Sequence, residues 1–257
     1  MNAEPIIRVE GFAAAYEGET ILRDVSFEVL PGEVFVILGG SGCGKSTLLK
    51  HLIGLYRPAA GRILIEGRDV ATAEGPDRAS ILRRIGVMYQ QGALFGSMTL
   101  RDNVRLPLEE HTDLPDDAMD AVVEMKLQLV GLRGFENHMP SEISGGMRKR
   151  AAIARAMALD PRILFLDEPS AGLDPITSAE LDELILQLAR SLGMTFVVVT
   201  HELPSIYAIT DRAIMLDKRA KTIVAAGRPA DLRDHPDNAW VRQFFRREAA
   251  ASREEKA

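Results

Sequence analysis

The chain has 257 residues, which is enough for one large α/β domain or two small ones. Its 31 basic and 37 acidic side chains give a net charge of −6, so no general basic field invites nucleic acid. Its purely apolar runs are short, as at 163–166, whereas a membrane span needs about 20 residues. We therefore expect no membrane crossing and no nucleic-acid partner.

The N-terminal sequence MNAEPIIRVEGF lacks the basic-then-apolar layout of a secretory signal. Cys43 is the one cysteine, so an internal disulfide cannot form, as suits a reducing cytoplasm. Any work at a membrane would then depend on a partner.

The first third of the chain is rich in short β segments, which we expect at 6–10, 21–30 and 62–66. The last two alternate apolar and polar residues, which is typical of half-buried strands. Residues 34–38 differ, because they are apolar at every position, as in a strand buried on both faces of a parallel sheet. This strand leads into a glycine-rich turn and a predicted helix at 45–54.

The pattern turns helical at about 95–160 and then alternates strand and helix again. A helix at 115–132 is followed by strands at 162–166, 195–200 and 213–216 and by a helix at 176–192. The chain is predicted to be an α/β protein with a parallel-sheet core, an antiparallel β subdomain and an inserted helical subdomain. One domain would span 5–235, and 236–257 would add a C-terminal helix and a charged tail.

Residues 39–47, GGSGCGKST, match the phosphate-binding pattern G-x-x-x-x-G-K-[ST] between a buried strand and a helix. Glycines let the backbone wrap closely around phosphates, the lysine faces the β and γ phosphates, and the serine hydroxyl can ligate Mg²⁺. The predicted phosphate loop consists of Gly39, Gly40, Ser41, Gly42, Cys43, Gly44, Lys45, Ser46 and Thr47.

The apolar strand ILFLDE at 163–168 ends in two acids. Asp167 stands where a carboxylate can hold Mg²⁺, directly or through water. Glu168 follows it, where a general base could take a proton from an attacking water. Together with the phosphate loop, this predicts a nucleotide-hydrolysing site.

A second helix start suited to an anion lies at Ser144, Gly145 and Gly146, in the sequence ISGGM. Because the chain already has a phosphate loop, we infer that this turn meets the nucleotide held by a second copy. Two copies would then face each other head to tail. The positive side chains that follow either form a solvated helix face or share in the field around the γ-phosphate; they are Arg148, Lys149, Arg150 and Arg155.

The order GGSGCGKST, ISGGM, ILFLDEP, SAGLD and a lone histidine resembles the nucleotide-binding subunits of ABC transporters over about residues 5–235. The resemblance implies the ABC type of P-loop ATPase fold, hydrolysis of ATP with Mg²⁺, a sandwich dimer and an integral membrane permease as partner. In that family ISGGM occupies the place of the signature motif.

The resemblance also places four further residues. Tyr16 falls where an aromatic ring stacks on adenine, although an exposed strand tyrosine is the alternative. Gln90 matches the glutamine that reaches Mg²⁺ and the attacking water, with Gln91 leaving the register open. Asp174 matches the residue that crosses the dimer seam and can also cap the helix at 176–192. His201 matches the switch histidine at the γ-phosphate.

The signature begins with Ile143 and ends with Met147, where leucine and glutamine are usual. With QQGALFGSMTLRDNVRLPL and DPITSAELDELI, this resembles the ATPases of Mla-type, MCE-associated lipid transporters. That branch implies phospholipid transport, an MCE-domain protein, a small accessory subunit and a peripheral place at the cytoplasmic face of the inner membrane. The cargo is implied by the resemblance alone.

Two alternatives remain open at this point. The chain could energise the transport of another cargo, such as an amino acid, a lipoprotein or a drug, or it could be an ABC ATPase that serves as an assembly factor. Near the C-terminus, Trp240, Phe244 and Phe245 form an apolar stripe at helical spacing. This stripe predicts either a helix packed on the body or a docking surface for a neighbouring subunit.

Overall fold

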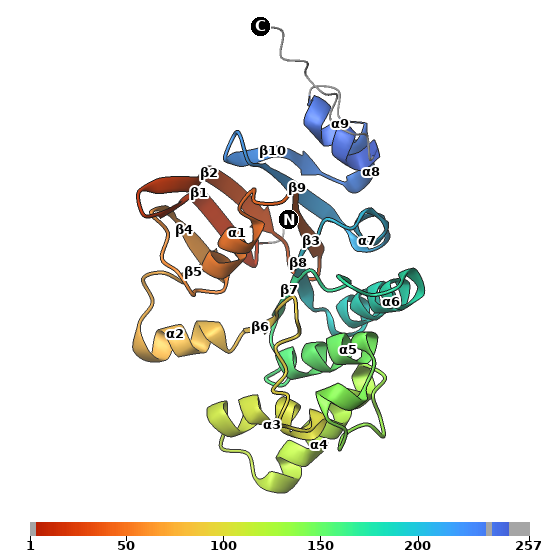
Figure 1. Cartoon of the computed structure of the whole chain (residues 1–257). Coiled ribbons are helices and arrows are strands. Elements are labelled where there is room, and N and C mark those ends of the chain that lie inside the picture. The colour runs from red at the N-terminus through yellow and green to blue at the C-terminus, as the bar shows by residue number, and fades with distance from the viewer. Residues whose placement is uncertain (1–3, 235–237, 247–257) are drawn as a thin grey trace, which may run out of the picture.

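The computed structural model describes residues 4–234 and 238–246, which form two sheets and the helices around them (Figure 1). The smaller sheet is antiparallel, with the strand order β2-β1-β4-β5. The first strand runs past the predicted end at residue 10. Register shifts interrupt its alternation of buried and exposed residues, so the sequence pattern did not reveal this extension. The strands are β1 (Ile7–Tyr16), β2 (Glu19–Val29), β4 (Ala60–Ile65) and β5 (Arg68–Asp69).

The larger sheet has six strands in the order β10-β9-β3-β8-β7-β6. Its neighbouring strands are parallel except β10, which pairs antiparallel with β9. The strands are β3 (Val34–Gly39), β6 (Ile85–Met88), β7 (Ile163–Asp167), β8 (Thr195–Val199), β9 (Arg212–Asp217) and β10 (Thr222–Gly227). The mostly parallel sheet and the smaller antiparallel sheet together confirm the predicted α/β fold class.

Strand β3 is apolar at every position because both of its faces are buried. Val34, Val36 and Leu38 belong to the core that the sheet shares with the helical part of the molecule. Phe35 and Ile37 belong to a second core, which the sheet shares with the antiparallel sheet and the first helix. Because side chains of a strand alternate between faces, a strand between two cores needs no polar position.

Most of the helices surround the parallel sheet, and three form a helical lobe at one end of the molecule (Figure 1). The lobe consists of α3 (Leu100–His111), α4 (Asp116–Leu129) and α5 (Gly145–Ala156), inside the region predicted to be helical. The others are α1 (Lys45–Leu52), α2 (Gly75–Leu82), α6 (Pro175–Leu192), α7 (Leu203–Ile209), α8 (Pro229–Arg233) and α9 (Ala239–Arg246), with a 3₁₀ turn at Pro140–Glu142.

A buried amide holds the loop that enters the helical lobe. Asn103 on α3 is fully buried, and its Oδ1 accepts the backbone N–H of Phe95 at 2.7 Å. Its Nδ2 donates to the carbonyls of Phe95 at 3.1 Å and Met98 at 3.2 Å. Since a buried amide is costly unless it is bonded, these contacts fix the loop between β6 and α3.

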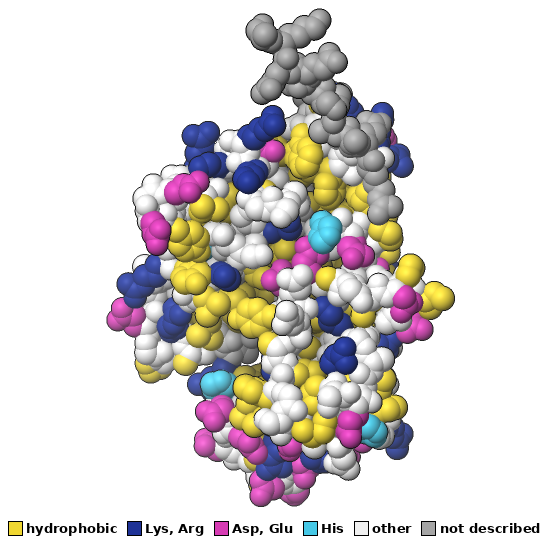
Figure 2. All heavy atoms as spheres, viewed as in Figure 1, with side chains coloured by type: hydrophobic (Ala, Val, Ile, Leu, Met, Phe, Trp, Pro, Cys, Tyr) yellow, Lys and Arg dark blue, Asp and Glu magenta, His cyan; other side chains and the backbone are white. Residues whose placement is uncertain are grey.

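Several elements had no clear sequence signal, namely β10, α2, α7 and α8. The predicted C-terminal helix is α9, packed on the body, while the charged tail at 247–257 lies outside the described residues. No helix of the described ranges is long and apolar enough to cross a membrane. Basic and acidic side chains are interspersed on the face shown in Figure 2.

Candidate active site

The loop between β3 and α1 depends on glycine for its shape. Gly39, Gly42 and Gly44 have φ values of +146°, +71° and +103°, which residues with a Cβ rarely adopt. A Cβ on Gly39 would also lie 2.5 Å from Cys43 Sγ and 2.6 Å from the carbonyl oxygen of Leu216. The loop can therefore take this path only with glycine at these positions.

Lys45 is the first residue of α1 and lies over the loop. Its Nζ donates to the carbonyls of Gly39 at 2.8 Å and Gly40 at 3.3 Å. Ser41 and Ser46 are exposed, whereas Cys43 is buried beneath the loop. Burial raises the pKa of the Cys43 thiol, so the thiol stays protonated and inert near neutral pH.

The two acids at the end of β7 lie beside this loop, because β8 alone separates β7 from β3 in the sheet. Glu168 has φ +48° and places its Oε1 2.7 Å from Nδ1 of His201, which follows β8. Burial and the neighbouring Glu168 carboxylate raise the pKa of Asp167, while Lys45 and Lys149 oppose the rise. Carboxylate and imidazole thus meet at the carboxyl ends of adjacent strands.

Two carboxylate oxygens of this pair have no protein partner. Asp167 Oδ1 and Glu168 Oε2 are both buried and accept no hydrogen bond from the described residues. A buried oxygen without a donor is costly unless water, a cation or a ligand supplies the missing contact. These oxygens are therefore free to take a metal ion and a proton.

A buried lysine connects these acids to the loop after β6. Lys149 on α5 donates to the carbonyl of Gln90 and, at 3.3 Å, to that of Glu168. Burial lowers the pKa of Lys149, and the charges of Asp167 and Glu168 oppose the shift. The interpretation of this lysine as part of a solvated helix face is therefore wrong. Its spacing from Gly146 and Ile153, which are both buried, was the available signal.

The other positive side chains of α5 bond to neighbouring protein groups. Arg155 donates to the carbonyls of Ala93 at 2.6 Å and Gly92 at 3.2 Å. Arg148 donates to the carbonyl of Ile143 at 2.8 Å, and Arg150 pairs with Glu180 at 3.1 Å. Arg155 therefore fixes the segment that follows Gln90 and Gln91, both of which are exposed.

An aromatic group lies at the end of β1, beside α1. Tyr16 is 38% exposed and meets Tyr56 edge to face, with ring centroids 5.8 Å apart. His51 is buried between Tyr16 and Phe12, and its Nδ1 lies 2.8 Å from the carbonyl oxygen of Thr47. Sequence reasoning gave His51 no role, although its place one turn after Thr47 on α1 puts it near the phosphate loop.

The second glycine-rich helix start has its own contacts within the chain. Ser144 caps α5, and its Oγ accepts the backbone N–H of Met147 at 3.2 Å. A Cβ on Gly146 would lie 2.4 Å from Cγ2 of Thr177 on α6, so glycine lets these helices touch. Within the described residues, no hydrogen bond joins this turn to the phosphate loop.

Asp174 begins the neighbouring helix, α6, as its capping residue. Its Oδ1 accepts the backbone N–H groups of Ile176 at 3.0 Å and Thr177 at 3.1 Å, and its Oδ2 accepts the Thr177 hydroxyl at 2.5 Å. These bonds lower the pKa of Asp174, with the Thr177 hydroxyl contributing most. The predicted role of Asp174 as the cap of this helix is confirmed.

The chain is similar to a known protein family and to several of its members. The family model described as "ABC transporter" matches residues 22–171. The chain is 44% identical over 226 residues to the "Intermembrane phospholipid transport system ATP-binding protein MlaF" of Escherichia coli K12, covering 88% of this chain and 82% of that protein. It is also 44% identical over 239 residues to the "Probable ribonucleotide transport ATP-binding protein mkl" of Mycobacterium leprae, covering 93% of this chain and 68% of that protein.

A solved structure shares the fold at a level that also supports a family relationship. The ATP-binding cassette MJ0796, in a dimeric post-hydrolysis state bound to ADP and Pi, has a TM-score of 0.78 and 30% identity. The match covers 86% of this chain and 98% of that chain.

Proposed function

Because the chain belongs to the ABC transporter family and is an ATPase of that family, we propose that it hydrolyses ATP to drive phospholipid transport through a membrane permease. The observation that carries this proposal is the pairing of Glu168 with His201 beside the phosphate loop. We assign the ATPase unit to about residues 5–235, with its helical subdomain at about 95–160, and a C-terminal helix and a charged tail to 236–257.

The protein binds the nucleotide at its phosphates and at its adenine ring. Its phosphates lie in the phosphate loop, where backbone N–H groups face them and Lys45 leaves its loop carbonyls to bind the β and γ phosphates. Its adenine ring stacks on Tyr16, which His51 and Tyr56 hold in place.

The residues present fit Mg²⁺ as the cation of the nucleotide. Asp167 has a buried oxygen without a protein donor, and Ser46 presents a hydroxyl at the start of α1. No group of three or more His, Cys, Asp or Glu in the described ranges could hold a metal alone, which suits an ion that takes most ligands from phosphates and water. Ser46, Asp167 and Gln90 would hold it, and Mg²⁺ would neutralise charge on the phosphates.

Hydrolysis depends on groups at the ends of β6, β7 and β8. Glu168 accepts the proton of the attacking water at a carboxylate oxygen. His201 keeps that carboxylate oriented and contacts the γ-phosphate. Gln90 orients the water, and Lys149 ties its backbone to that of Glu168.

A second copy of the chain completes the site. Ser144, Gly145 and Gly146 of each copy face the γ-phosphate held by the other, and Asp174 lies along the seam. The exposure of Ser144 and the absence of hydrogen bonds between this turn and the phosphate loop in the described residues support an intermolecular role. The similar cassette MJ0796 was solved as a dimer bound to ADP and Pi, which supports a dimeric state for this chain.

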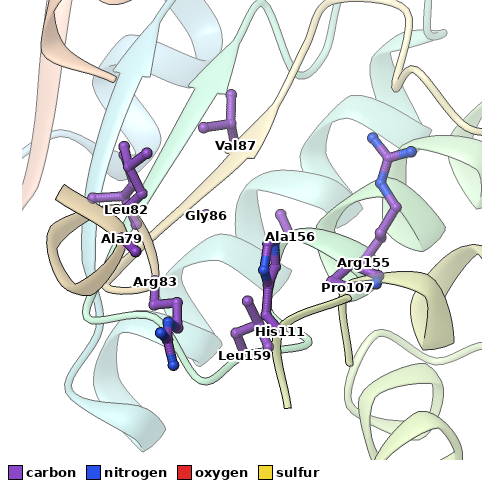
Figure 3. Close-up of a pocket in the computed structure, with 11 residues that line it drawn as sticks. Ala79, Leu82, Arg83, Gly86, Val87, Pro107, His111, Arg155, Ala156 and Leu159 are labelled. Atoms are coloured by element: carbon purple, nitrogen blue, oxygen red, sulfur yellow. The ribbon is translucent and has the colours of Figure 1, made fainter. Parts of the chain in front are cut away.

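The permease docks in a pocket between the core and the helical lobe (Figure 3). This pocket of about 370 Å³ lies between α2 and β6 on one side and α3 and α5 on the other. Its lining includes the apolar side chains of Leu82 and Leu159 together with Arg83, His111 and Arg155. Arg155 also binds the segment after Gln90. When the docked permease moves, Arg155 would therefore transmit the movement to that segment and to Gln90.

The cargo is proposed from relatives rather than from contacts, since cargo need not touch this subunit. The E. coli relative is named for phospholipid transport and the mycobacterial relative for ribonucleotide transport. Met147 and the sequence after Gln90 favour the Mla branch, so an MCE-domain protein and a small accessory subunit complete the complex. The complex places this chain at the cytoplasmic face of the inner membrane.

The test is co-purification of the tagged chain from detergent-solubilised membranes of its own host. We expect a permease together with an MCE-domain protein. Recovery of a soluble solute-binding protein instead would replace phospholipid by another cargo. Recovery of no integral membrane protein would contradict the transport function and favour an assembly factor.

A further inference from the structure

The C-terminal helix α9 is firmly anchored on the body of the protein. Val241 is fully buried, Phe245 is 5% exposed, and the Phe245 ring lies against Tyr207 of α7 with centroids 6.0 Å apart. Asn238 caps the helix, since its Oδ1 accepts the N–H groups of Trp240 at 3.0 Å and Val241 at 3.3 Å. The position of α9 is thus set by contacts on one side.

Another side of α9 meets the phosphate loop. A Cβ placed on Gly40 would lie 3.2 Å from Cζ2 and 3.5 Å from Cη2 of Trp240, so the indole edge packs directly on the Gly40 backbone. Gly40 does not have a positive φ, unlike Gly39, Gly42 and Gly44. A Cβ at position 40 would therefore crowd the indole, whereas a positive φ does not require glycine there.

Trp240 contacts the loop at Gly40, which also bonds to Lys45, the proposed phosphate-binding lysine. The carbonyl of Gly40 accepts from Lys45 Nζ at 3.3 Å and from the N–H of Cys43 at 3.3 Å. A rigid ring against Gly40 limits how far this carbonyl can move when Lys45 leaves it. At its other side α9 touches α7, which begins two residues after His201. The helix therefore connects the loop and the segment that follows His201.

We propose that Trp240 is a positioning residue, which holds the phosphate loop in its nucleotide-binding shape and couples the C-terminal helix to nucleotide occupancy. This inference rests on the proposed role of the loop in binding ATP. The apolar residues of α9 then have two separate tasks: Val241 and Phe245 dock the helix, and Trp240 supports the loop.

The first test compares two truncations on the same helix of the full chain. Trp240→Ala should weaken ATP affinity in filter binding by roughly three- to tenfold, while the hydrolysis rate at saturating ATP changes less than about twofold. Trp240→Phe should restore most of the affinity, because a ring still covers Gly40. The matched control is Phe244→Ala, since Phe244 is partly buried against the core.

The control separates support of the loop from general loosening of the helix. Phe244→Ala should lower the melting temperature and leave ATP affinity near that of the parent. Equal losses of affinity in the Trp240→Ala and Phe244→Ala variants would overturn the proposal. So would unchanged affinity in a folded Trp240→Ala variant.

The second test uses the fact that Trp240 is the sole tryptophan of the chain. Its emission in the full chain should change on titration with ATP and should not change in the Lys45→Ala variant. If filter binding shows that ATP binds and the emission stays constant, the coupling proposed for Trp240 is wrong while the proposed function stands. If the parent chain binds no ATP, the proposed function itself fails, and this inference fails with it.

Discussion

Two helices of this protein begin with glycines and a serine nearby, and the glycines serve different purposes. Before α1, Gly42 and Gly44 have positive φ and let the chain curl into a loop. At the start of α5, Gly146 is helical, and it is required because a Cβ would lie 2.4 Å from Thr177 Cγ2. Backbone conformation explains the first pair, and the approach of two helices explains Gly146.

The polar groups at the two helix starts also differ. The α1 start has Lys45 above the loop and the carboxylates of Asp167 and Glu168 beside it, each with one buried oxygen that accepts no hydrogen bond from the described residues. The α5 start has Ser144, whose hydroxyl oxygen is already engaged as a cap. One helix start therefore has the groups that we propose for catalysis, whereas the other offers N–H groups and a hydroxyl. This difference leads to the expectation of two copies for each complete site.

The largest expected effect is at the α1 start. Lys45→Ala removes the ammonium that faces the phosphates, so ATP binding should fall below detection in a filter-binding assay. Arg190 is an exposed basic residue in the last turn of α6, so Arg190→Ala is the control and should bind ATP nearly normally. Normal ATP affinity in the Lys45→Ala variant would remove the basis for treating this loop as the phosphate site.

Glu168→Gln tests the proposed base, the Glu168 carboxylate beside the α1 start. The amide keeps the size of the side chain and cannot accept a proton, so turnover should slow by roughly 10²–10⁴ while ATP still binds. Phosphate release measures the effect, and Glu183→Gln, an exposed change on α6, serves as the control. Phosphate release near the parent rate would show that another group is the base.

Gly146→Ala tests the packing explanation for glycine at the α5 start. The added Cβ would meet Thr177 Cγ2, so the free energy of unfolding should fall by about 1–3 kcal/mol. Adding Thr177→Ser removes that methyl and keeps the hydroxyl that donates to Asp174, so stability should largely return. Denaturant unfolding measures both variants. If the second change restores nothing, the close approach of α5 and α6 is not what requires glycine.

The smallest effect is expected at Asp182 on α6, the helix that Gly146 contacts. Burial raises the pKa of this carboxyl to about 6, above its ordinary value of 3.8, so the folded state holds the proton more tightly than the unfolded state. The stability it contributes is complete below about pH 3.8 and is lost as the pH rises through 6.

Asp182→Asn should therefore melt at a higher temperature than the parent above pH 6, and the gap should close towards pH 4. Asp182 lines a pocket of α6 and α7 that also includes His201, so ATP affinity is measured alongside the melts. Thermal melts between pH 4 and 8 measure the difference. A gap of constant size across this range would mean that ionisation of Asp182 is not its cause.

The parts that sequence predicted best are those in which each residue has one local reason. Val34–Gly39 is apolar because both its faces are buried, and the glycines after it belong to a recognisable spacing. The acids at the end of β7 follow an equally plain apolar run. Period and spacing are properties of neighbouring residues, so they can be read along the chain.

The parts that sequence missed depend on contacts between distant segments. Lys149 is buried because α5 packs over the ends of β6 and β7, which no local pattern of charge reveals. The contact of Trp240 with Gly40 joins residues at opposite ends of the chain. The ring neighbours of His51 are Phe12 and Tyr16 on β1 and Tyr56 after α1. Helical spacing gave a hint for Lys149 and for His51, which lies one turn after Thr47.

The most direct test of the whole account is a disulfide between two copies. Ser41 and Ser144 are both exposed, and the account brings Ser144 of one copy to the phosphate loop of the other. In a Cys43→Ser, Glu168→Gln background, the Ser41→Cys, Ser144→Cys protein should form a covalent dimer on mild oxidation only with ATP present, and neither single cysteine should do so. A cross-link that forms equally without ATP, or ATP-bound protein that stays monomeric on oxidation, would contradict the shared nucleotide site.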